Sequence, residues 1–332
     1  MNLEDNGPDE ETPETYRQLQ DFYSWQNFTV TEKKHYLDWG SPLLNKALLG
    51  VQPGDSVCVC GAPNHGKTIS LTSMVLDILK RNENVLVLDF TLDDPKRKRF
   101  TQYAANLAQI DMNVIDFINL EHDGERRRRH KQALCQLELW LENQSLALFE
   151  TATVNRGERR LSQNSTGFIT ETLIRYRDLF PEKKIVVLVD ALNNVATSSA
   201  GDEYSQAQEV SDVLKRVLND TQSVLLATHH LRKNNGRRPT MDDLKGNNYL
   251  AYEMKVIIGL HNDLSVNGQA AEIYYVDQAQ PMVKVPVIEW HFLKNKCSDY
   301  KGVIFARQWP AQARVEEMPL EAQAPLMGML YK

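Results

Sequence analysis

The stretch VCVCGAPNHGKTISL, residues 57–71, decides the fold that this sequence predicts. An apolar run typical of a buried strand stops at Gly61, and a polar loop leads to a lysine, a hydroxyl residue and a second apolar run. Residues 61–68 match G-x-x-x-x-G-K-[ST] between a strand and a helix. Glycines let the backbone curl so that its N–H groups point inward, and the helix N-terminus adds partial positive charge. The stretch therefore predicts a phosphate-binding loop.

The residue types of this loop predict an ATP and Mg²⁺ site. Lys67 would reach the β- and γ-phosphates, and the hydroxyl of Thr68 would bind the metal ion. Asp190, which ends the apolar run KIVVLVD, is the expected second Mg²⁺ ligand, with a capping aspartate as the alternative. We expect the nucleotide to contact nine consecutive residues: Gly61, Ala62, Pro63, Asn64, His65, Gly66, Lys67, Thr68 and Ile69.

Composition excludes several classes of protein. Hydrophobic residues make up 42% of the 332 residues, and no apolar run approaches the roughly 18 residues that span a bilayer. The acidic N-terminus is unlike a signal peptide, so we expect a cytoplasmic protein without membrane contact. A net charge of -6 argues against a basic nucleic-acid coat. Cysteines at positions 58, 60, 135 and 297 lack paired metal-ligand spacing.

Apolar and amphipathic segments alternate along the chain, which predicts an α/β fold with a mostly parallel sheet flanked by helices. Expected strands cover 56–60, 84–90, 146–150, 184–192 and 223–230, and expected helices cover 67–81, 95–109, 123–143, 167–180 and 203–219. Three further strands over 255–263, 271–279 and 285–295 follow at short intervals and predict an antiparallel edge. A short amphipathic helix is expected over 13–27.

Several blocks between about Tyr36 and Trp309 resemble, in order, the RecA-fold motor domain of DnaB-type replicative helicases, including the phage helicase-primase branch. The resembling blocks are YLDWGSPLLNKALLGVQPGDSVCVCGAPNHGKT, VLVLDFTLDD, IVVLVDALNNV, LLATHHLRK, RRPTMDDLKGNNYL and FLKNKCSDYKG. The resemblance implies a RecA-like ATPase domain over 36–309, between an N-terminal extension (1–35) and a peripheral tail (310–332). Only about 35 residues precede the core, so we expect neither a primase nor a collar domain.

The resemblance also implies catalytic roles. Asp93 falls where the family has the glutamate that activates water, although an N-cap for the helix beginning at Pro95 is the alternative. His230 matches the γ-phosphate sensor, and His229 should point the other way, into packing. Lys294 and Lys296 match the K-x-R finger that a neighbouring subunit supplies, with two solvated lysines as the alternative.

The same resemblance implies that the loops over about 194–204 and 232–248 face single-stranded DNA. The second loop offers cations and backbone N–H groups to phosphates, and its expected DNA contacts are Arg232, Lys233, Arg237, Arg238, Lys245, Gly246 and Asn247. Two other basic runs, KRKR at 96–99 and RRRR at 126–129, lie on expected helices among acidic residues. We interpret both runs as solvated faces or subunit contacts.

The function implied by the resemblance is an ATP-driven 5′ to 3′ helicase or translocase that forms a homo-oligomer, usually of six subunits, and works with loader or replication partners. The alternative is a non-motor ATPase akin to KaiC-like or recombinase relatives, which Asp93, Lys296 and the short N-terminal extension favour. The complete loop signature favours the helicase. A small-molecule kinase does not explain the sensor and finger blocks.

Overall fold

The structure of the chain is a computed structural model that describes residues 18–19, 22–23, 36–117, 123–156, 159–197, 202–232, 236–244, 253–276 and 283–330. The helix expected over 13–27 lies mostly outside the described residues. The four of its residues that are described are helical, and Leu19, Phe22 and Tyr23 among them are exposed.

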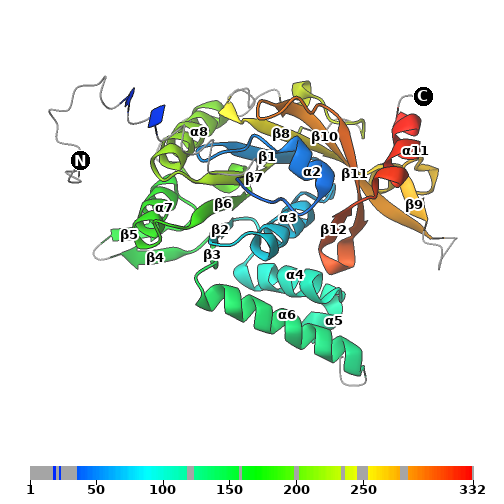
Figure 1. Cartoon of the computed structure of the whole chain (residues 1–332), viewed down its shortest axis with the longest axis horizontal. Coiled ribbons are helices and arrows are strands. Elements are labelled where there is room, and N and C mark those ends of the chain that lie inside the picture. The colour runs from blue at the N-terminus through cyan, green and yellow to red at the C-terminus, as the bar shows by residue number, and fades with distance from the viewer. Residues whose placement is uncertain are drawn as a thin grey trace.

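A ten-stranded sheet crosses the described part of the molecule (Figure 1). Its order is β12-β11-β10-β8-β1-β7-β6-β2-β3, with β9 paired to β10. Neighbours from β8 to β3 run parallel, whereas β8, β10, β11 and β12 pair antiparallel. The strands are β1 (Ser56–Gly61), β2 (Val85–Thr91), β3 (Leu146–Glu150), β6 (Lys184–Asp190), β7 (Val224–His230), β8 (Val256–His261), β9 (Tyr274–Val276), β10 (Lys284–Asn295), β11 (Val303–Trp309) and β12 (Arg314–Glu317). The predicted mixed sheet is confirmed.

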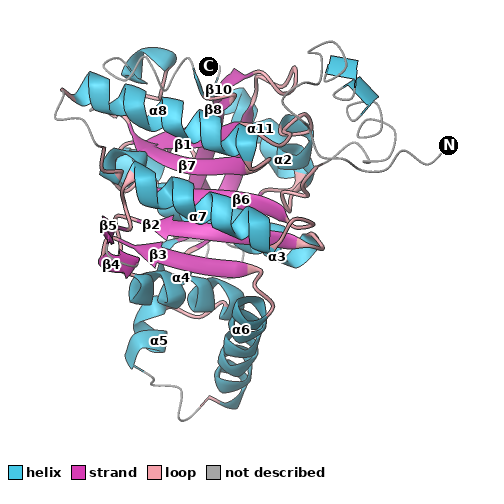
Figure 2. Cartoon of the chain, turned by 90° about the vertical axis from the view of Figure 1, so that its left-hand side faces the viewer, coloured by secondary structure: helices cyan, strands magenta, loops and turns pink. Residues whose placement is uncertain are grey.

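Helices cover both faces of the parallel part of the sheet. Figure 2 shows α7 and α8 in front of the strands and α3 behind them. The helices are α2 (Pro42–Ala47), α3 (Lys67–Arg81), α4 (Lys96–Ala108), α5 (Met112–Phe117), α6 (Gly124–Glu142), α7 (Thr166–Leu179), α8 (Glu203–Asp220), α10 (Asp263–Asn267) and α11 (Leu320–Leu330). A separate hairpin pairs β4 (Thr153–Arg156) with β5 (Arg159–Ser162).

Alternation along the central strands divides the apolar residues between two cores. In β1, Val57 and Val59 face the core under α3 and α4, whereas Cys58 and Cys60 face the core under α7 and α8. All residues of β1 and β2 are buried, as expected for parallel strands covered on both faces. This burial explains why these strands appear in the sequence as unbroken apolar runs.

The segment after Trp309 is more closely packed than the expected peripheral tail. Strand β12 pairs with β11, and Val315 lies in the core under α3. The backbone N–H of Val315 donates to Ser73 Oγ at 2.8 Å, which joins this strand to α3. Helix α11 covers a small third core that includes Phe305 and Leu326.

Strand direction separates two groups of predicted site residues. Strands β1, β2, β6, β7 and β8 run parallel, so their carboxyl ends meet at one edge of the sheet. Strand β10 runs the other way: its last residue, Asn295, lies opposite Val256, which in turn pairs with Val57 at the start of β1. Residues just after β10 therefore lie at the edge opposite to the phosphate-binding loop.

Candidate nucleotide-binding site

The loop between β1 and α3 has the backbone that a phosphate-binding loop requires. Gly66, the N-cap of α3, has a φ of 85°, and a Cβ there would lie 2.6 Å from Ile288 Cδ1. No side chain caps this end of α3, so the N–H groups of its first turn remain available to an anion. A glycine is needed at this position because an L side chain rarely adopts this φ.

Lys67 holds its ammonium group at the mouth of this loop. Its Nζ donates to the carbonyl oxygens of Gly61 and Ala62, both at 3.0 Å. The side chain is buried, which lowers the pKa of Lys67, while the charge of Asp190 opposes that shift. The two carbonyls hold a cation in place beside the expected position of the phosphates.

A cavity of about 640 Å³ opens at the carboxyl edge of the sheet, where the loop lies. The predicted residues that line it are Pro63, Asn64, Gly66, Lys67, Thr68, Ile69, Asp93, Asp190 and His230. Three of the predicted nucleotide contacts are not among the lining residues. Gly61 and Ala62 contribute the carbonyls that hold Lys67. The ring of His65 packs edge-on against His261 at 5.6 Å, behind the loop.

Asp190 is fixed at the end of β6 by partners on three elements. Its Oδ1 accepts from Thr228 Oγ1 at 2.6 Å, and its Oδ2 accepts from Arg99 Nη2 at 2.7 Å. Burial alone would raise the pKa of Asp190, but Arg99 and hydrogen bonds from Thr228 and Thr68 lower it. Asp190 is therefore ionised, and it does not act as a helix cap.

Mg²⁺ fits the donors that this end of the cavity presents. Thr68 contributes a hydroxyl and Asp190 a carboxylate, the hard oxygen ligands that Mg²⁺ prefers. Mg²⁺ in such sites binds one or two protein oxygens and keeps its remaining positions for water and phosphate. The pair would therefore suffice to hold the ion beside a bound triphosphate.

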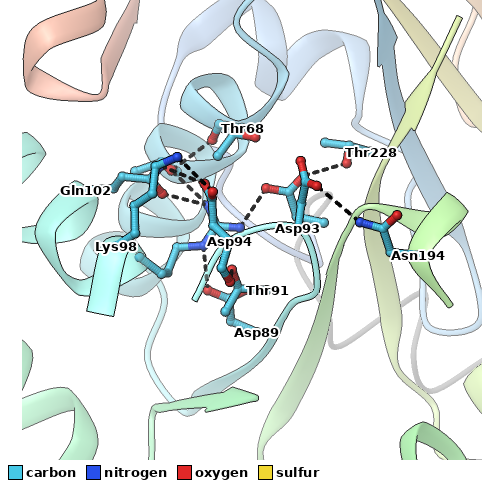
Figure 3. Close-up of polar contacts among 12 residues, drawn as sticks. Thr68, Asp89, Thr91, Asp93, Asp94, Lys98, Gln102, Asn194 and Thr228 are labelled. Atoms are coloured by element: carbon cyan, nitrogen blue, oxygen red, sulfur yellow. Dashed lines mark hydrogen bonds and ion pairs between the residues drawn. The ribbon is translucent and has the colours of Figure 1, made fainter. Parts of the chain in front are cut away.

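Asp93 and Asp94 follow β2 and both line the cavity. Figure 3 shows the two aspartates close together, with Asn194 next to Asp93 and Lys98 next to Asp94. The N-cap of α4 is Pro95, without a side-chain cap bond, so the capping alternative for Asp93 does not apply. Its carboxylate instead accepts from Asn194 Nδ2 at 3.3 Å.

The two histidines that end β7 differ in environment, as alternation predicts. His230 is exposed and lines the cavity, whereas His229 is 3% exposed and is not among the lining residues. Burial and the charge of Lys67 lower the pKa of His230, although Asp93 and Asp190 act in the other direction. Burial lowers the pKa of His229 to about 4. His230 is thus a neutral hydrogen-bonding group at pH 7.

Lys294 and Lys296 do not reach the cavity of their own chain. They lie at the end of β10, where the backbone N–H of Lys296 donates to the carbonyl of Lys255 at 3.0 Å. Burial, together with the charge of Lys296, lowers the pKa of Lys294 to about 8. Both lysines lie at the edge of the sheet opposite to the loop that contains Lys67.

The described part of the basic loop is tied to the protein by carboxylates. Arg238 donates to both oxygens of the fully buried Glu289, at 2.7 and 3.0 Å. Arg237 pairs with Asp243, which is also buried. Because Nε and Nη2 of its guanidinium both donate to Glu289, we assign Arg238 to anchoring the loop rather than to phosphate contact.

Of the other expected DNA contacts, Arg232 lies within the described residues. The backbone N–H of Arg232 donates to the carbonyl of Asp243, and its side chain is exposed. Lys233, Lys245, Gly246 and Asn247 lie outside the described residues.

Sequence reasoning missed a buried charge cluster behind the cavity. The sequence predicts a solvated face or a subunit contact for the run 96–99, but Arg99 is fully buried and contacts both Asp89 and Asp190. Two signals in the sequence point to it. Asp89 interrupts an apolar strand, and Arg99 lies one helical turn before the buried Tyr103. The run 126–129 agrees better with the solvated interpretation, since Arg126 and Arg128 are exposed and pair with acids on their own helix.

No helix in the described parts of the chain is both long and apolar enough to cross a membrane.

A comparison with curated proteins returned no match. Two of the solved structures that share the fold are described by their titles. One is titled "ATPase Domain of G40P", with a TM-score of 0.75, 15% identity, and coverage of 93% of this chain and 100% of that chain. The other is titled "The Structure Of A DnaB-Like Replicative Helicase And Its Interactions With Primase", with a TM-score of 0.72, 16% identity, and coverage of 94% and 69%.

The family of this chain follows from a match that covers most of its sequence. The model of the DnaB-like helicase C-terminal domain matches residues 37–286, the span that contains the phosphate-binding loop and the residues at the carboxyl ends of β2, β6 and β7. The chain therefore belongs to the DnaB-like helicase C-terminal domain family.

Proposed function

We propose that the protein is an ATP-dependent, ring-forming helicase or translocase that acts on single-stranded DNA. The observation that carries this proposal is the convergence of Lys67, Thr68, Asp93, Asp190 and His230 on one cavity at the carboxyl edge of the sheet. These residues come from four separate segments of the chain, and only the fold brings them together.

Each of these side chains has a separate task in phosphoryl transfer. Lys67 binds the β- and γ-phosphates, and the N-terminus of α3 adds its free N–H groups. Asp93 orients the attacking water, with Asn194 holding the carboxylate in place. His230, neutral at pH 7, donates its one ring N–H to a γ-phosphate oxygen. The magnesium ion, held by Thr68 and Asp190, would neutralise the charge of the phosphates when bound.

A shared site between subunits is the second part of the proposal. Lys294 and Lys296 lie at the sheet edge opposite to Lys67, so they can serve only the nucleotide of a neighbouring chain. We propose a homo-oligomer, with six subunits as the expected number for this family. A lysine at 296 supplies a point charge where arginine would supply a planar fork. The stabilisation of the transition state by this finger should therefore be modest.

Single-stranded DNA is the proposed track. With Arg238 engaged by Glu289, phosphate contact falls to the exposed Arg232 and to Lys233 and Lys245. Such contacts would be independent of base sequence and would weaken as salt rises.

The test compares ATP turnover with and without single-stranded DNA. We expect DNA to raise turnover and Lys67→Ala to abolish it, because the phosphates lose their cation. Lys80→Ala, at an exposed position on the same helix, is the matched control and should leave turnover unchanged. Equal turnover with and without DNA would contradict the motor function.

Subunit mixing tests the shared site. Lys296→Ala subunits retain Lys67, and Lys67→Ala subunits retain Lys296, so some interfaces in a mixed assembly hold both residues. Lys67→Ala alone should be inactive and Lys296→Ala alone slowed, so we expect mixtures to turn over more ATP than their content of Lys296→Ala subunits does alone. Mixtures no faster than that content would contradict a finger supplied by a neighbour.

The alternative function is a non-motor ATPase that uses nucleotide to switch an assembly. The observation that favours it is that Arg237 and Arg238, two of the expected DNA contacts, are paired with buried carboxylates. This function predicts ATP turnover that responds to oligomerisation and not to DNA. Turnover measured over a range of protein concentrations, with and without DNA, separates the two functions.

A further inference from the structure

A fully buried arginine lies directly behind the proposed magnesium ligand. Arg99, in the first turn of α4, is 0% exposed, and its Nη2 is 2.7 Å from Asp190 Oδ2. Its Nη1 donates to Thr72 Oγ1 at 3.3 Å and to Gln102 Oε1 at 3.2 Å. Arg99 itself is not among the residues that line the cavity. Asp190 is therefore in contact with a fixed positive charge on its buried side while it faces the cavity on the other.

This contact poses an electrostatic problem for a metal ligand. A guanidinium paired with a carboxylate compensates its charge, and a cation approaching from the cavity is then attracted less strongly. The same pair also fixes the orientation of Asp190, together with the hydrogen bond from Thr228 Oγ1 at 2.6 Å. Orientation is useful to a metal ligand, whereas loss of its negative charge is not.

Asp89 supplies the missing negative charge. It lies in β2, is 0% exposed, and its Oδ2 is 3.2 Å from Arg99 Nε. Tyr103 donates its hydroxyl proton to the same oxygen at 2.7 Å. Among the described residues, Asp89 Oδ1 has no hydrogen-bond partner. Burial raises the pKa of Asp89, and the charge of Arg99 and the hydrogen bond from Tyr103 oppose that shift. With both carboxylates ionised, one positive and two negative groups give the cluster a net charge of -1, which is the charge that Asp190 alone would carry.

A purely structural role explains this arrangement poorly. Apolar side chains of similar volume commonly stabilise a core as well as a buried ion pair does, without the cost of desolvating charges. A buried carboxylate that leaves one oxygen without a partner adds a further cost. The cluster is better explained if its charge acts on the neighbouring site.

We propose that Arg99 and Asp89 are positioning residues that orient Asp190 while preserving the negative charge with which it binds magnesium. Arg99 fixes the carboxylate, and Asp89 offsets the charge that Arg99 brings. This inference rests on the proposed ATPase function, but it concerns only the binding of metal and nucleotide.

The experiment measures the magnesium dependence of nucleotide binding by the full chain, without DNA and without turnover. A fluorescent ADP analogue is held at fixed concentration while Mg²⁺ is titrated. Asp89→Asn keeps the shape of the side chain and removes its charge, so Arg99 then compensates Asp190 alone. We expect the Mg²⁺ concentration at half-saturation to rise about 10-fold, as for other changes behind a metal ligand.

The double variant Asp89→Asn with Arg99→Met removes both charges and returns the cluster to -1. We expect its Mg²⁺ dependence to return to within about threefold of the original protein, the remaining difference reflecting the lost contact between Arg99 and Asp190, and independent structural damage would not produce this coupling. Tyr103→Phe is the matched control, because it removes a hydrogen bond to Asp89 without changing the charge. Its Mg²⁺ dependence should stay within about twofold of the original.

Each outcome decides between the proposals. If Asp89→Asn binds Mg²⁺ as the original protein does, the charge inference is overturned and the ATPase proposal stands. If Asp89→Asn weakens Mg²⁺ binding and the double variant does not recover it, the cluster is structural and the inference is again overturned. If the original protein shows no magnesium-dependent nucleotide binding, the proposed function fails as well. Should Asp89→Asn fail to fold, the double variant is compared with Arg99→Met, which differs from it only in the charge of Asp89: a lower Mg²⁺ requirement in Arg99→Met supports the inference, and equal requirements overturn it.

Discussion

Replacing Arg238 with alanine should destabilise the protein, because the change leaves the carboxylate of Glu289 buried without its guanidinium partner. Both oxygens of Glu289 accept from Arg238, and Glu289 is 0% exposed whereas the Arg238 side chain is 40% exposed. Exposed ion pairs contribute about 0–1 kcal/mol, and breaking a fully buried pair costs about 3–5 kcal/mol. For this half-exposed pair we expect a loss of about 2 kcal/mol in the free energy of unfolding.

One neighbour limits that loss. His291 Nε2 lies 2.8 Å from Glu289 Oε2 and remains in the variant as a partner. Adding Glu289→Gln to the Arg238→Ala variant should recover part of the stability, because it removes the charge that has lost its partner. Arg127→Ala, at an exposed position on α6, is the control for loss of an arginine and should change stability by less than about 0.5 kcal/mol.

Urea unfolding at a fixed protomer concentration measures these differences. The free energy of unfolding should decrease with urea concentration at the same slope for every variant. Binding of single-stranded DNA, measured over a range of salt, provides the opposing test. A phosphate contact predicts unchanged stability and a salt dependence that is weaker by about one unit. That result would refute the assignment of Arg238 to anchoring the loop.

Three further predictions follow from burial and backbone geometry. His229 has a pKa of about 4 in the fold and about 6.5 when unfolded, so unfolding takes up its proton between these values. Stability should therefore fall as pH is lowered through that window, and His229→Asn should reduce this slope by about 1.4 kcal/mol per pH unit in urea titrations; an unchanged slope would contradict this. Burial raises the pKa of Cys297 to about 12, so iodoacetamide at pH 8 should label the exposed Cys135 first. Mass spectrometry that finds both cysteines labelled equally fast would contradict this prediction. Gly66→Ala places a Cβ 2.6 Å from Ile288 Cδ1 at a φ of 85°. The change should abolish binding of a fluorescent ADP analogue and lower the free energy of unfolding by about 1–3 kcal/mol. Retained binding would count against the loop assignment.

Local patterns predicted the elements that position the site. The helix that begins at Lys67 and ends at Arg81 was placed correctly, since its start is set by the glycine loop and its length by apolar periodicity. The unbroken apolar run that ends in Asp190 predicted a central strand, because a strand that is covered on both faces is apolar at nearly every position. Sequence reasoning therefore works where a segment's own neighbours decide its conformation.

Contacts between distant segments could not be predicted in this way. Arg238 and Glu289 are separated by 51 positions, and nothing local distinguishes Arg238 from the arginine before it. Arg99 appeared as one of four consecutive basic residues, although only this residue faces the buried side of its helix. Strand β12, with the sequence RVEE, is too short and too charged to resemble a strand until its partner is known.

The antiparallel direction of β10 has a consequence for counting. Each protomer carries a phosphate-gripping half at one end of its strands and a lysine-bearing half at the other. If the lysines complete a neighbour's site as proposed, subunits stacked in an open row leave one unmatched half at each terminus, so such a row has one working centre fewer than it has subunits. Closing the row into a circle joins the two unmatched halves, so the subunit that completes the circle adds two working centres where each earlier addition adds one.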